Sequence, residues 1–509
     1  MNLSLVRNAF SNLLGAVIPA LVALGTVPLV VKGLGDANYG VYSLVTAIVG
    51  YFAVIDINVT AGSVKFIAEF NANRENCEAQ KRIDETVFFG LAVYSLLGLL
   101  GAIGLYGGAH FFVTRVFSVP PQLVGEAVAT LKLAALGFFL GQLQSYLQSI
   151  PQSLMRYDIA GRIEVVFGTG VPLLTVAVLM LGYGLFEVIL LRVVASAINC
   201  VVLWRCICRL LPELAWRRPG ATIRRELLGF SAYSFLSRFA GLSYAYADKL
   251  IIGALVGVTG LAYFTVASTL ANRILSLTFR LSGVLFPAAS ALAARGELER
   301  LRALYLKASR YVVFINASVL VLVAVFSYQI LYYWMNPQFA RAGQVVLAVM
   351  ALSQFIDSLT SLPSLVNDGM GHPRVSGMFA LVRAAFGLVV VWLGVDGWGI
   401  VGAAWGHLIA SVLMTCIFLA AVHGRTVPAQ MKDLVRQAYL PSVFGVGLVA
   451  VLANAGNRLF DGGPLDLVLL VLLTVGLLFA WGALCVIEKD DKILAWSRVK
   501  GLLSMRKAV

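Results

Sequence analysis

Repeated runs of about 20 apolar residues constrain the fold of this chain more than any other feature. A run of this length crosses the hydrocarbon core of a bilayer as a helix, because a helix satisfies its own backbone hydrogen bonds where no water is present. Of the 509 residues, 60% are hydrophobic and only 13% are charged, which excludes a soluble globular protein. The expected fold class is therefore an all-α polytopic membrane protein with about 14 transmembrane helices. The fourteen spans are placed at about 9–31, 40–61, 86–108, 126–150, 164–183, 186–208, 228–257, 260–288, 309–334, 341–363, 376–396, 398–422, 438–457 and 465–487.

The distribution of Lys and Arg sets the orientation of these spans. Most of the 39 basic residues fall in short segments on one side of the membrane, whereas the opposite loops hold Lys32, Arg115, Arg341 and Arg458. Basic loops stay in the cytoplasm, so both termini are expected there. The net charge of +14 then reflects orientation in the bilayer, and no nucleic-acid partner is expected.

The segments between spans are short. The first apolar run continues to Val31, too long for a signal-peptide core, which indicates an uncleaved first helix. Residues 62–85 and 289–308 are charged and helix-prone, and are expected to form amphipathic cytoplasmic helices. No loop is long enough for a folded domain of ordinary size.

The two halves of the chain resemble each other. Pro151 is followed eleven residues later by Arg162, and Pro363 is followed at the same spacing by Arg374. Each pair leads, after one span, to a Gly–aromatic–Gly turn, at 182–184 and at 397–399. This pattern predicts two six-helix lobes related by a pseudo-twofold axis along the membrane normal, an architecture that supports alternating access. The predicted divisions are an N-lobe at 1–220, a C-lobe at 221–430, and two C-terminal helices with a cytoplasmic tail at 431–509.

The hairpin at 228–287 carries four cations at membrane depth, Arg238, Lys249, Arg273 and Arg280. A cation at the bilayer centre costs about 2.5–3.5 kcal/mol, so these side chains are expected to face water, one another or an anion. Guanidinium forks and ammonium groups suit phosphate oxygens, which makes the four residues candidates for binding a diphosphate. The alternatives are pairing with intramembrane acids and, for Arg238 and Arg280, snorkelling to the cytoplasmic interface.

Other polar residues in the spans allow two interpretations. Asp56, Asp248, Asp357 and Arg192 are candidates for gating or ion coupling, and equally for fixed ion pairs. Neighbours in a helix do not face each other, so Asp248 is expected to pair with another helix rather than with Lys249. For Arg192 an ion pair with Glu187 is an equal expectation.

A polar face on the fourth span provides the remaining candidates. Gln144, Gln148 and Gln152 recur at four-residue steps and, with Lys132, are candidates for lining a sugar path. The alternatives are hydrogen bonds between helices for the glutamines and snorkelling for Lys132.

The six Cys and four His form no redox or metal-binding spacing, so neither a metal site nor a catalytic centre is expected.

Residues Pro28 to Asp56 resemble the opening of the Wzx-type O-antigen and polysaccharide flippases. The matching residues are Pro28, Leu34–Gly35, Tyr39–Gly40 and Asp56. Asp248–Lys249 followed by Ile251–Ile252–Gly253, and the run Gly397 to Ala404, resemble the seventh and twelfth helices of the same family. The resemblance extends over nearly the whole chain, and its specificity lies in the order and spacing of the motifs.

This resemblance implies a polysaccharide transporter of the multidrug/oligosaccharidyl-lipid/polysaccharide exporter superfamily. The implied function is to move a polyprenyl-diphosphate-linked oligosaccharide from the cytoplasmic to the outer leaflet of a bacterial cytoplasmic membrane, for O-antigen, capsule or exopolysaccharide. The implied partners are the lipid-linked oligosaccharide, membrane lipids, and components for polymerisation and chain length. No cofactor is expected, and the driving force stays open among a proton, a sodium ion and the membrane potential.

Two alternatives remain. One is a multidrug or cation antiporter of the same superfamily, although a basic lumen repels cationic substrates. The other is a membrane enzyme that acts on lipid-linked sugar. The longest outer segment, 109–125, holds one Arg, one His and no acid, so the chain is not expected to be an enzyme.

Overall fold

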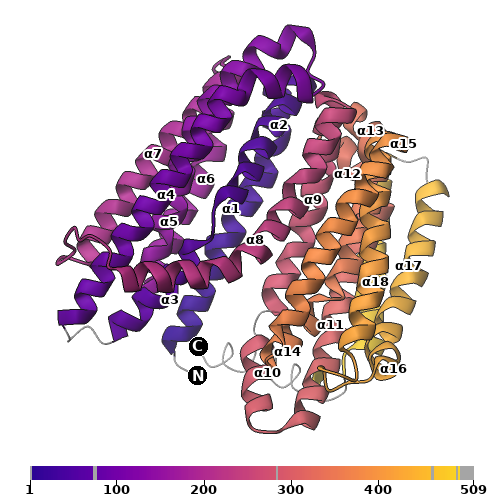
Figure 1. Ribbon diagram of the computed structural model, residues 1–509. Helices are drawn as coiled ribbons and strands as arrows, with labels where there is room; N and C mark the ends of the chain where they lie inside the picture. The colour runs from indigo at the N-terminus through magenta and orange to yellow at the C-terminus, as the bar shows by residue number, and fades with distance from the viewer. Residues whose placement is uncertain (1–2, 73–76, 283–284, 460–462, 489–490, 493–509) are drawn as a thin grey trace, which may run out of the picture. The chain divides into compact units, whose positions relative to one another are not determined.

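The structure is a computed structural model that describes residues 3–72, 77–282, 285–459, 463–488 and 491–492 (Figure 1). Within these ranges the regular structure is helical, apart from an isolated β-bridge between His423 and Val427. Ten helical segments of the described chain are long and apolar enough to cross a membrane, which confirms an all-helical, multi-pass membrane protein. Helices α8 (Ala221–Leu255) and α9 (Val258–Ser282) are not among these ten segments of the described chain.

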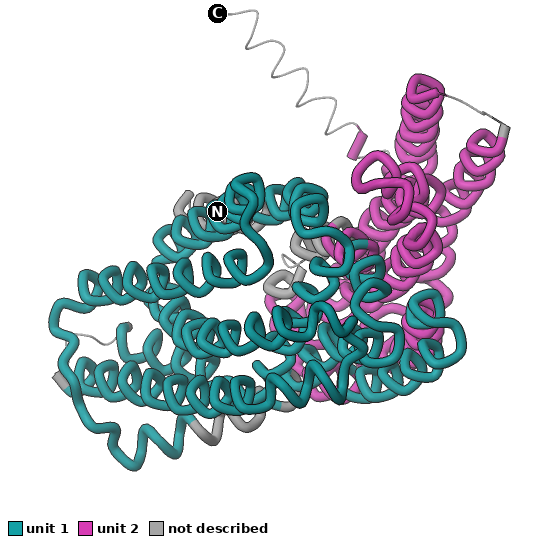
Figure 2. The backbone as a smooth tube through the Cα atoms, turned by 90° about the horizontal axis from the view of Figure 1, so that it is seen from above, with its two compact units in different colours: residues 1–266, 380–403 teal, residues 267–379, 404–509 magenta. Residues whose placement is uncertain are grey.

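The chain divides into two units, residues 1–266 with 380–403 and residues 267–379 with 404–509 (Figure 2). The lobe boundaries expected after residues 220 and 430 stay a prediction. Besides α8, the helices wholly within unit 1 are α1 (Leu3–Leu34), α2 (Asp36–Phe52), η1 (Ala53–Ile55), α3 (Val59–Ala72), α4 (Cys77–Phe111), η2 (Phe112–Val116), η3 (Pro121–Leu123), α5 (Val124–Ser153), α6 (Tyr157–Met180) and α7 (Leu185–Leu210).

Unit 2 contains the remaining helices of the described chain. They are α10 (Leu285–Ala294), α11 (Leu298–Val325), α12 (Ser327–Trp334), α13 (Pro337–Ser358), α14 (Ser361–Gly369), α16 (Met431–Leu434), η4 (Val435–Tyr439), α17 (Leu440–Leu459), α18 (Pro464–Trp481) and η5 (Gly482–Val486). Helices α9 and α15 (Pro373–Val422) have residues in both units.

Glycine turns separate the helices where the sequence predicts two adjacent spans. Helix α6 ends before Gly182, which has φ of 87°, and α7 begins after Gly184. Helix α15 holds two predicted spans, and its backbone leaves helical dihedrals at Trp398 and Gly399, where Gly399 has φ of 57°. A positive φ is accessible to glycine without steric cost, so both predicted breaks are confirmed.

Several predicted helices have other limits in the structure. The segment 289–308 was expected to be one linking helix, but Gly296, with φ of 73°, separates α10 from α11, which continues into the membrane span. The segment 62–85 is likewise shared between α3 and the start of α4. The predicted span at 309–334 is interrupted at Phe326, where α11 ends and α12 follows. These boundaries depend on single backbone angles, which hydropathy does not reveal.

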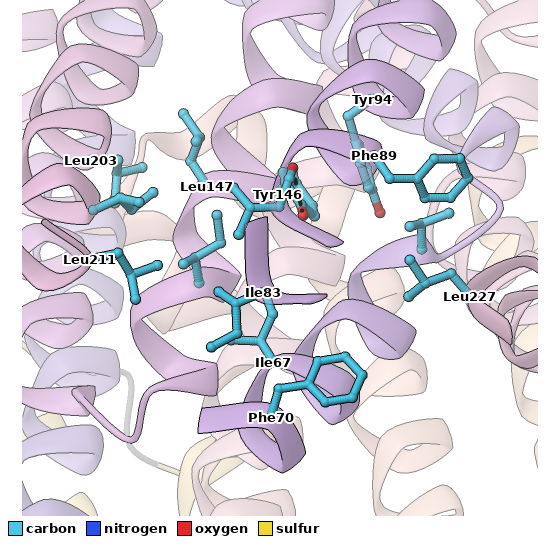
Figure 3. Close-up of a cluster of buried hydrophobic side chains, with 14 of the residues drawn as sticks. Ile67, Phe70, Ile83, Phe89, Tyr94, Tyr146, Leu147, Leu203, Leu211 and Leu227 are labelled. Carbon is cyan, nitrogen blue, oxygen red and sulfur yellow. Dashed lines mark hydrogen bonds between the residues drawn. The ribbon is translucent and has the colours of Figure 1, made fainter. Parts of the chain in front are cut away.

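Unit 1 is held together by a cluster of buried side chains at one end of its helices (Figure 3). Tyr94 and Tyr146 stack with ring centroids 5.1 Å apart. The Tyr146 hydroxyl donates to the carbonyls of Thr86 and Val87, each at 3.1 Å. Gly90 leaves room for this ring, because a Cβ at that position would lie 2.1 Å from Tyr146. The cluster fixes α3, α4, α5 and α7 as one body.

Unit 2 has two corresponding clusters. One joins α10, α11, α14, α15 and η4 around the buried residues Tyr305 and Phe418. The other joins α11 and α13 to the C-terminal helices α17 and α18 around Val313, Phe355 and Val446. Helices α17 and α18 are therefore packed onto α11 of unit 2.

Candidate functional site

A cavity of about 850 Å³ lies inside unit 1 and is the most developed candidate site. Its walls come from α2, α5, α6 and α7, which run side by side (Figure 1), with Thr60 of α3 at its margin. The lining residues on α5 extend from Ala134 to Gln152, which is about 27 Å at 1.5 Å per residue. The cavity therefore follows α5 for a length close to the thickness of the hydrocarbon core.

Small residues on α5 create this space. Gly137, Gly141 and Ser145 recur at four-residue steps on the lining face. A Cβ at Gly141 would meet nothing within 4 Å. The small side chains at these positions leave space beside α5.

The three predicted glutamines line the same cavity. The Gln148 amide donates to the carbonyl of Ala160 on α6 at 3.0 Å. For Gln148 the structure thus shows a hydrogen bond between helices, which was the alternative to lining a sugar path. Gln144 and Gln152 make no side-chain hydrogen bond within the described part of the chain, and both are half-buried. Their amide groups are thus free to bind a polar molecule in the cavity.

Arg192 brings a cation into the cavity. Its guanidinium lies over the ring of Tyr42 on α2, 5.1 Å from the centroid. Its Nε atom is buried without a hydrogen-bond partner, and the described residues provide no ion pair for it. Of the two alternatives for Arg192, the ion pair with Glu187 is wrong, because Glu187 accepts from the Gly184 amide at 2.9 Å and so caps the start of α7. Positions five apart on a helix also point to different faces.

Asp56 forms an ion pair with Arg238 elsewhere in unit 1. The Arg238 Nη2 atom lies 2.7 Å from Asp56 Oδ2, and the carboxylate is fully buried while the Arg side chain is 32% exposed. Asp56 follows η1, and its Oδ1 accepts from the Asn58 amide at 2.8 Å. The helical run ends at Ile55, and Asn58, with φ of 59°, directly precedes α3. The carboxylate thus stabilises the break between α2 and α3 and binds α8 to it.

Asp248 and Lys249 contact each other, contrary to the expectation for neighbours in a helix. The Lys249 ammonium lies 3.6 Å from Asp248 Oδ1 and donates to the Ala245 carbonyl at 2.8 Å. The long Lys side chain folds back along α8 to the Ala245 carbonyl, which brings it near Asp248 although adjacent positions on a helix do not face each other. Asp248 is buried and has further interactions, so a contact with another helix remains compatible with this geometry.

Of the other predicted residues that the structure describes, none is among those that line this cavity. The Lys132 ammonium lies over the Tyr106 ring of α4, 5.2 Å from its centroid, and Lys132 is not among the lining residues. Arg273 is an exposed residue of α9, and Asp357 is half-buried in the last turn of α13. The side chain of Arg280 lies outside the described part of the structure.

Sequence reasoning missed several lining residues. Glu164 on α6, and Ser196 and Asn199 on α7, face the cavity together with Arg192. The Asn199 Oδ1 atom is buried without a hydrogen-bond partner in the described chain. Positions 192, 196 and 199 recur at steps of four and three, so a search for polar stripes beyond α5 detects this face.

The chain resembles solved structures over most of its length. It superposes on the lipid II flippase MurJ in an inward closed conformation with a TM-score of 0.68 and 13% identity, covering 92% of this chain and 98% of that one. It superposes on the inward-facing conformation of a multidrug resistance MATE family transporter of the MOP superfamily with a TM-score of 0.65 and 16% identity, covering 79% and 92%. The fold is therefore that of the MATE and MurJ proteins.

Sequence comparison narrows this class. Residues 34–343 match the family described as polysaccharide biosynthesis protein. The chain is also 20% identical over 404 residues to a putative O-antigen transporter of Shigella flexneri, which covers 79% of this chain and 94% of that protein. The chain belongs to the polysaccharide biosynthesis protein family.

Proposed function

We propose that this protein is a flippase that moves a polyprenyl-diphosphate-linked oligosaccharide from the cytoplasmic to the outer leaflet, for surface polysaccharide biosynthesis. The observation that carries the proposal is the cavity of unit 1, which combines free amide groups with a cation that has no ion pair in the described chain. Such a lining fits a carbohydrate that bears an anionic group, and it occurs in a member of the polysaccharide biosynthesis protein family.

The cavity residues have distinct roles in this proposal. Gln144, Gln152 and Asn199 offer both donors and acceptors, which match sugar hydroxyls. Arg192 binds an acidic sugar or a phosphate oxygen, because its guanidinium is not neutralised by a carboxylate of the described chain. Tyr42 supports that guanidinium from one side and leaves its hydrogen-bonding edge available.

The diphosphate is proposed to bind Arg238, Lys249, Arg273 and Arg280. Arg238 and Lys249 are already close to Asp56 and Asp248, so a phosphate must exchange with these carboxylates. This exchange gives the two acids a gating role, since substrate binding releases one ion pair and forms another. Asp357 stays a second candidate for ion coupling, with the driving ion open.

The proposal includes the finer architecture that the sequence predicts. It comprises fourteen spans in two six-helix lobes with a pseudo-twofold axis along the membrane normal, two C-terminal helices, and both termini in the cytoplasm of a bacterium. Alternating access then exposes the substrate first to the cytoplasm and then to the outside.

The test is a flipping assay with the purified protein in liposomes that contain a fluorescent lipid-linked oligosaccharide. Arg192→Ala should lower the initial rate at least tenfold, because a charge-assisted hydrogen bond contributes about 1.5–3 kcal/mol. Lys132→Met is the matched control, since Lys132 is also an intramembrane cation over a Tyr ring but does not line the cavity. It should retain the wild-type rate.

Three outcomes would overturn the proposal. If Arg192→Ala and a Gln144→Leu/Gln152→Leu variant flip at the wild-type rate, the cavity does not bind the substrate. Efflux of an organic cation without lipid flipping would indicate an antiporter instead, and chemical change of the lipid-linked sugar without translocation would indicate an enzyme.

A further inference from the structure

Unit 2 contains a second cavity, of about 690 Å³, whose lining is basic. Its charged residues are Arg295 in the turn after α10, Arg300, Lys307 and Arg310 of α11, and Glu488. The α11 residues 300, 303, 304 and 307 recur at steps of three, one and three, so they form one face of the helix. The helical period therefore brings the cations Arg300 and Lys307 to the same face of α11.

The acids around this cavity do not neutralise it. Lys307 already forms ion pairs, since its ammonium lies 2.8 Å from Asp491 and 3.4 Å from Glu488. Lys307 and the Tyr311 hydroxyl hold the pKa of Asp491 below its usual range, so this carboxylate stays ionised at neutral pH. Four cations thus line the cavity, against one lining carboxylate, Glu488, and two carboxylates at its margin, Glu297 and Asp491.

Three guanidinium groups retain capacity to bind an anion. Arg295 has no ion pair within the described residues. Among the described residues Arg300 pairs only with Glu297, at 3.0 Å, and its side chain is 74% exposed, so water screens that pair. Arg310 donates to the Cys485 carbonyl at 2.6 Å, lies 3.9 Å from Glu488, and has a buried Nε without a hydrogen-bond partner in the described chain.

Apolar side chains complete the walls of this cavity. Leu292, Leu304 and Leu306 line it beside the cations, and Leu304 is 37% exposed. The cavity lies where α10 gives way to α11, in the segment expected on the cytoplasmic side. Figure 1 places α10, the start of α11 and α16 at the same end of unit 2. A basic group beside an exposed apolar wall at a membrane surface matches a phospholipid, which joins a charged phosphate to acyl chains.

We propose that this cavity, hereafter the α10–α11 pocket, binds the phosphate of an anionic phospholipid from the cytoplasmic leaflet. Arg295, Arg300 and Arg310 contact the phosphate oxygens, and the acyl chains follow the leucines. Occupancy joins α10 and α11 to the segment that follows η5, because Glu488 lines the same pocket. This site is separate from the cavity of unit 1 and does not depend on the substrate assigned to the protein.

The experiment is native mass spectrometry of the full chain, released from detergent with phosphatidylglycerol, phosphatidylcholine or inorganic phosphate. The wild type should retain one phosphatidylglycerol in preference to phosphatidylcholine. Arg295→Gln/Arg300→Gln should weaken this binding about 30-fold, since each cation near a membrane surface contributes about 1 kcal/mol to the binding of an anionic lipid.

The matched control is Arg425→Gln/Lys432→Gln. It removes the same charge from exposed residues of unit 2 that do not line the pocket, and it should bind as the wild type does. A second pair, Arg295→Lys/Arg300→Lys, keeps the charge and should retain most of the binding. Leu304→Glu places an anion on the apolar wall without removing a cation and should also abolish retention.

Each other outcome contradicts the proposal. Equal retention of phosphatidylglycerol and phosphatidylcholine shows that the pocket does not select an anion. Inorganic phosphate that displaces the lipid at equal concentration shows a site for the free ion. An equal loss in the Arg425→Gln/Lys432→Gln control shows that only overall charge matters. Lipid retention involves no flipping, so failure here leaves the flippase proposal intact.

Discussion

The ion pair between Asp56 and Arg238 allows the sharpest test of the energetics. The two partners differ in exposure, since the Asp56 side chain is fully buried and that of Arg238 is 32% exposed. Removal of Arg238 leaves a buried carboxylate without its cation, which typically costs 3–5 kcal/mol. We expect about 3 kcal/mol for Arg238→Gln, the lower end, because water reaches the arginine side of the pair.

The reverse substitution should cost less. Asp56→Asn keeps a side-chain oxygen to accept from the Asn58 backbone amide, and the Arg238 guanidinium that loses its partner is partly hydrated. The loss is then that of one charge-assisted hydrogen bond, about 1.5 kcal/mol. The double variant removes both charges and should cost less than the sum, with a coupling free energy of about 2 kcal/mol.

The assay is unfolding of the detergent-solubilised chain by SDS, followed through the fluorescence of its eight Trp. Arg156→Gln is the control, because Arg156 and Asp158 form an exposed Arg–Asp pair at 3.0 Å, and its loss should not measurably change the unfolding midpoint. Equal midpoints for Arg238→Gln and Asp56→Asn, or additive effects in the double variant, would refute the reasoning.

Substitutions at three further positions test the packing and the titration of other groups. Gly40→Ala should destabilise by about 1–3 kcal/mol, because its Cβ would lie 2.0 Å from the Val258 carbonyl oxygen; a thermal melt equal to the wild type contradicts this. Gly141→Ala should fold normally while Gly141→Leu slows flipping, and an unchanged rate for Gly141→Leu argues against a substrate in the cavity. His423 Nδ1 donates to the Leu419 carbonyl and Nε2 accepts from the Tyr305 hydroxyl, each at 2.8 Å, so the neutral ring is the bound form. Burial lowers the pKa of His423 below 6.5, so the contribution of His423 to stability is complete above pH 6.5 and is lost as the pH falls through the folded-state pKa. His423→Gln should flatten this decline in a series of thermal melts at decreasing pH. If the melting temperature of the variant falls with pH as steeply as that of the wild type, other groups cause the decline.

Hydropathy and glycine spacing predicted much of the fold. The all-helical, multi-pass class follows from apolar runs, because the bilayer imposes a helix on any segment that crosses it. The breaks near Gly182 and Gly399 were predictable for a related reason, since only glycine readily adopts the backbone angles found there. The interruption at Phe326 was not, because no residue type there requires it.

The candidate site, too, was predictable from the sequence only in part. The sequence alone showed that the glutamines of α5 share one face, since that depends only on the helical period. It did not show that Glu164 and Asn199 line the same cavity from α6 and α7, because contacts between helices depend on the packing of whole surfaces.

The charged residues show most clearly what the sequence alone does not predict. The sequence established that cations lie at membrane depth and that lipid cannot surround them. Only the tertiary structure decided that Asp56 pairs with Arg238, that Lys249 folds back on Asp248, and that Arg192 has a Tyr ring rather than a carboxylate beside it. An ion pair forms over a few ångströms between residues that can be far apart in the chain, and that distance is set by the fold.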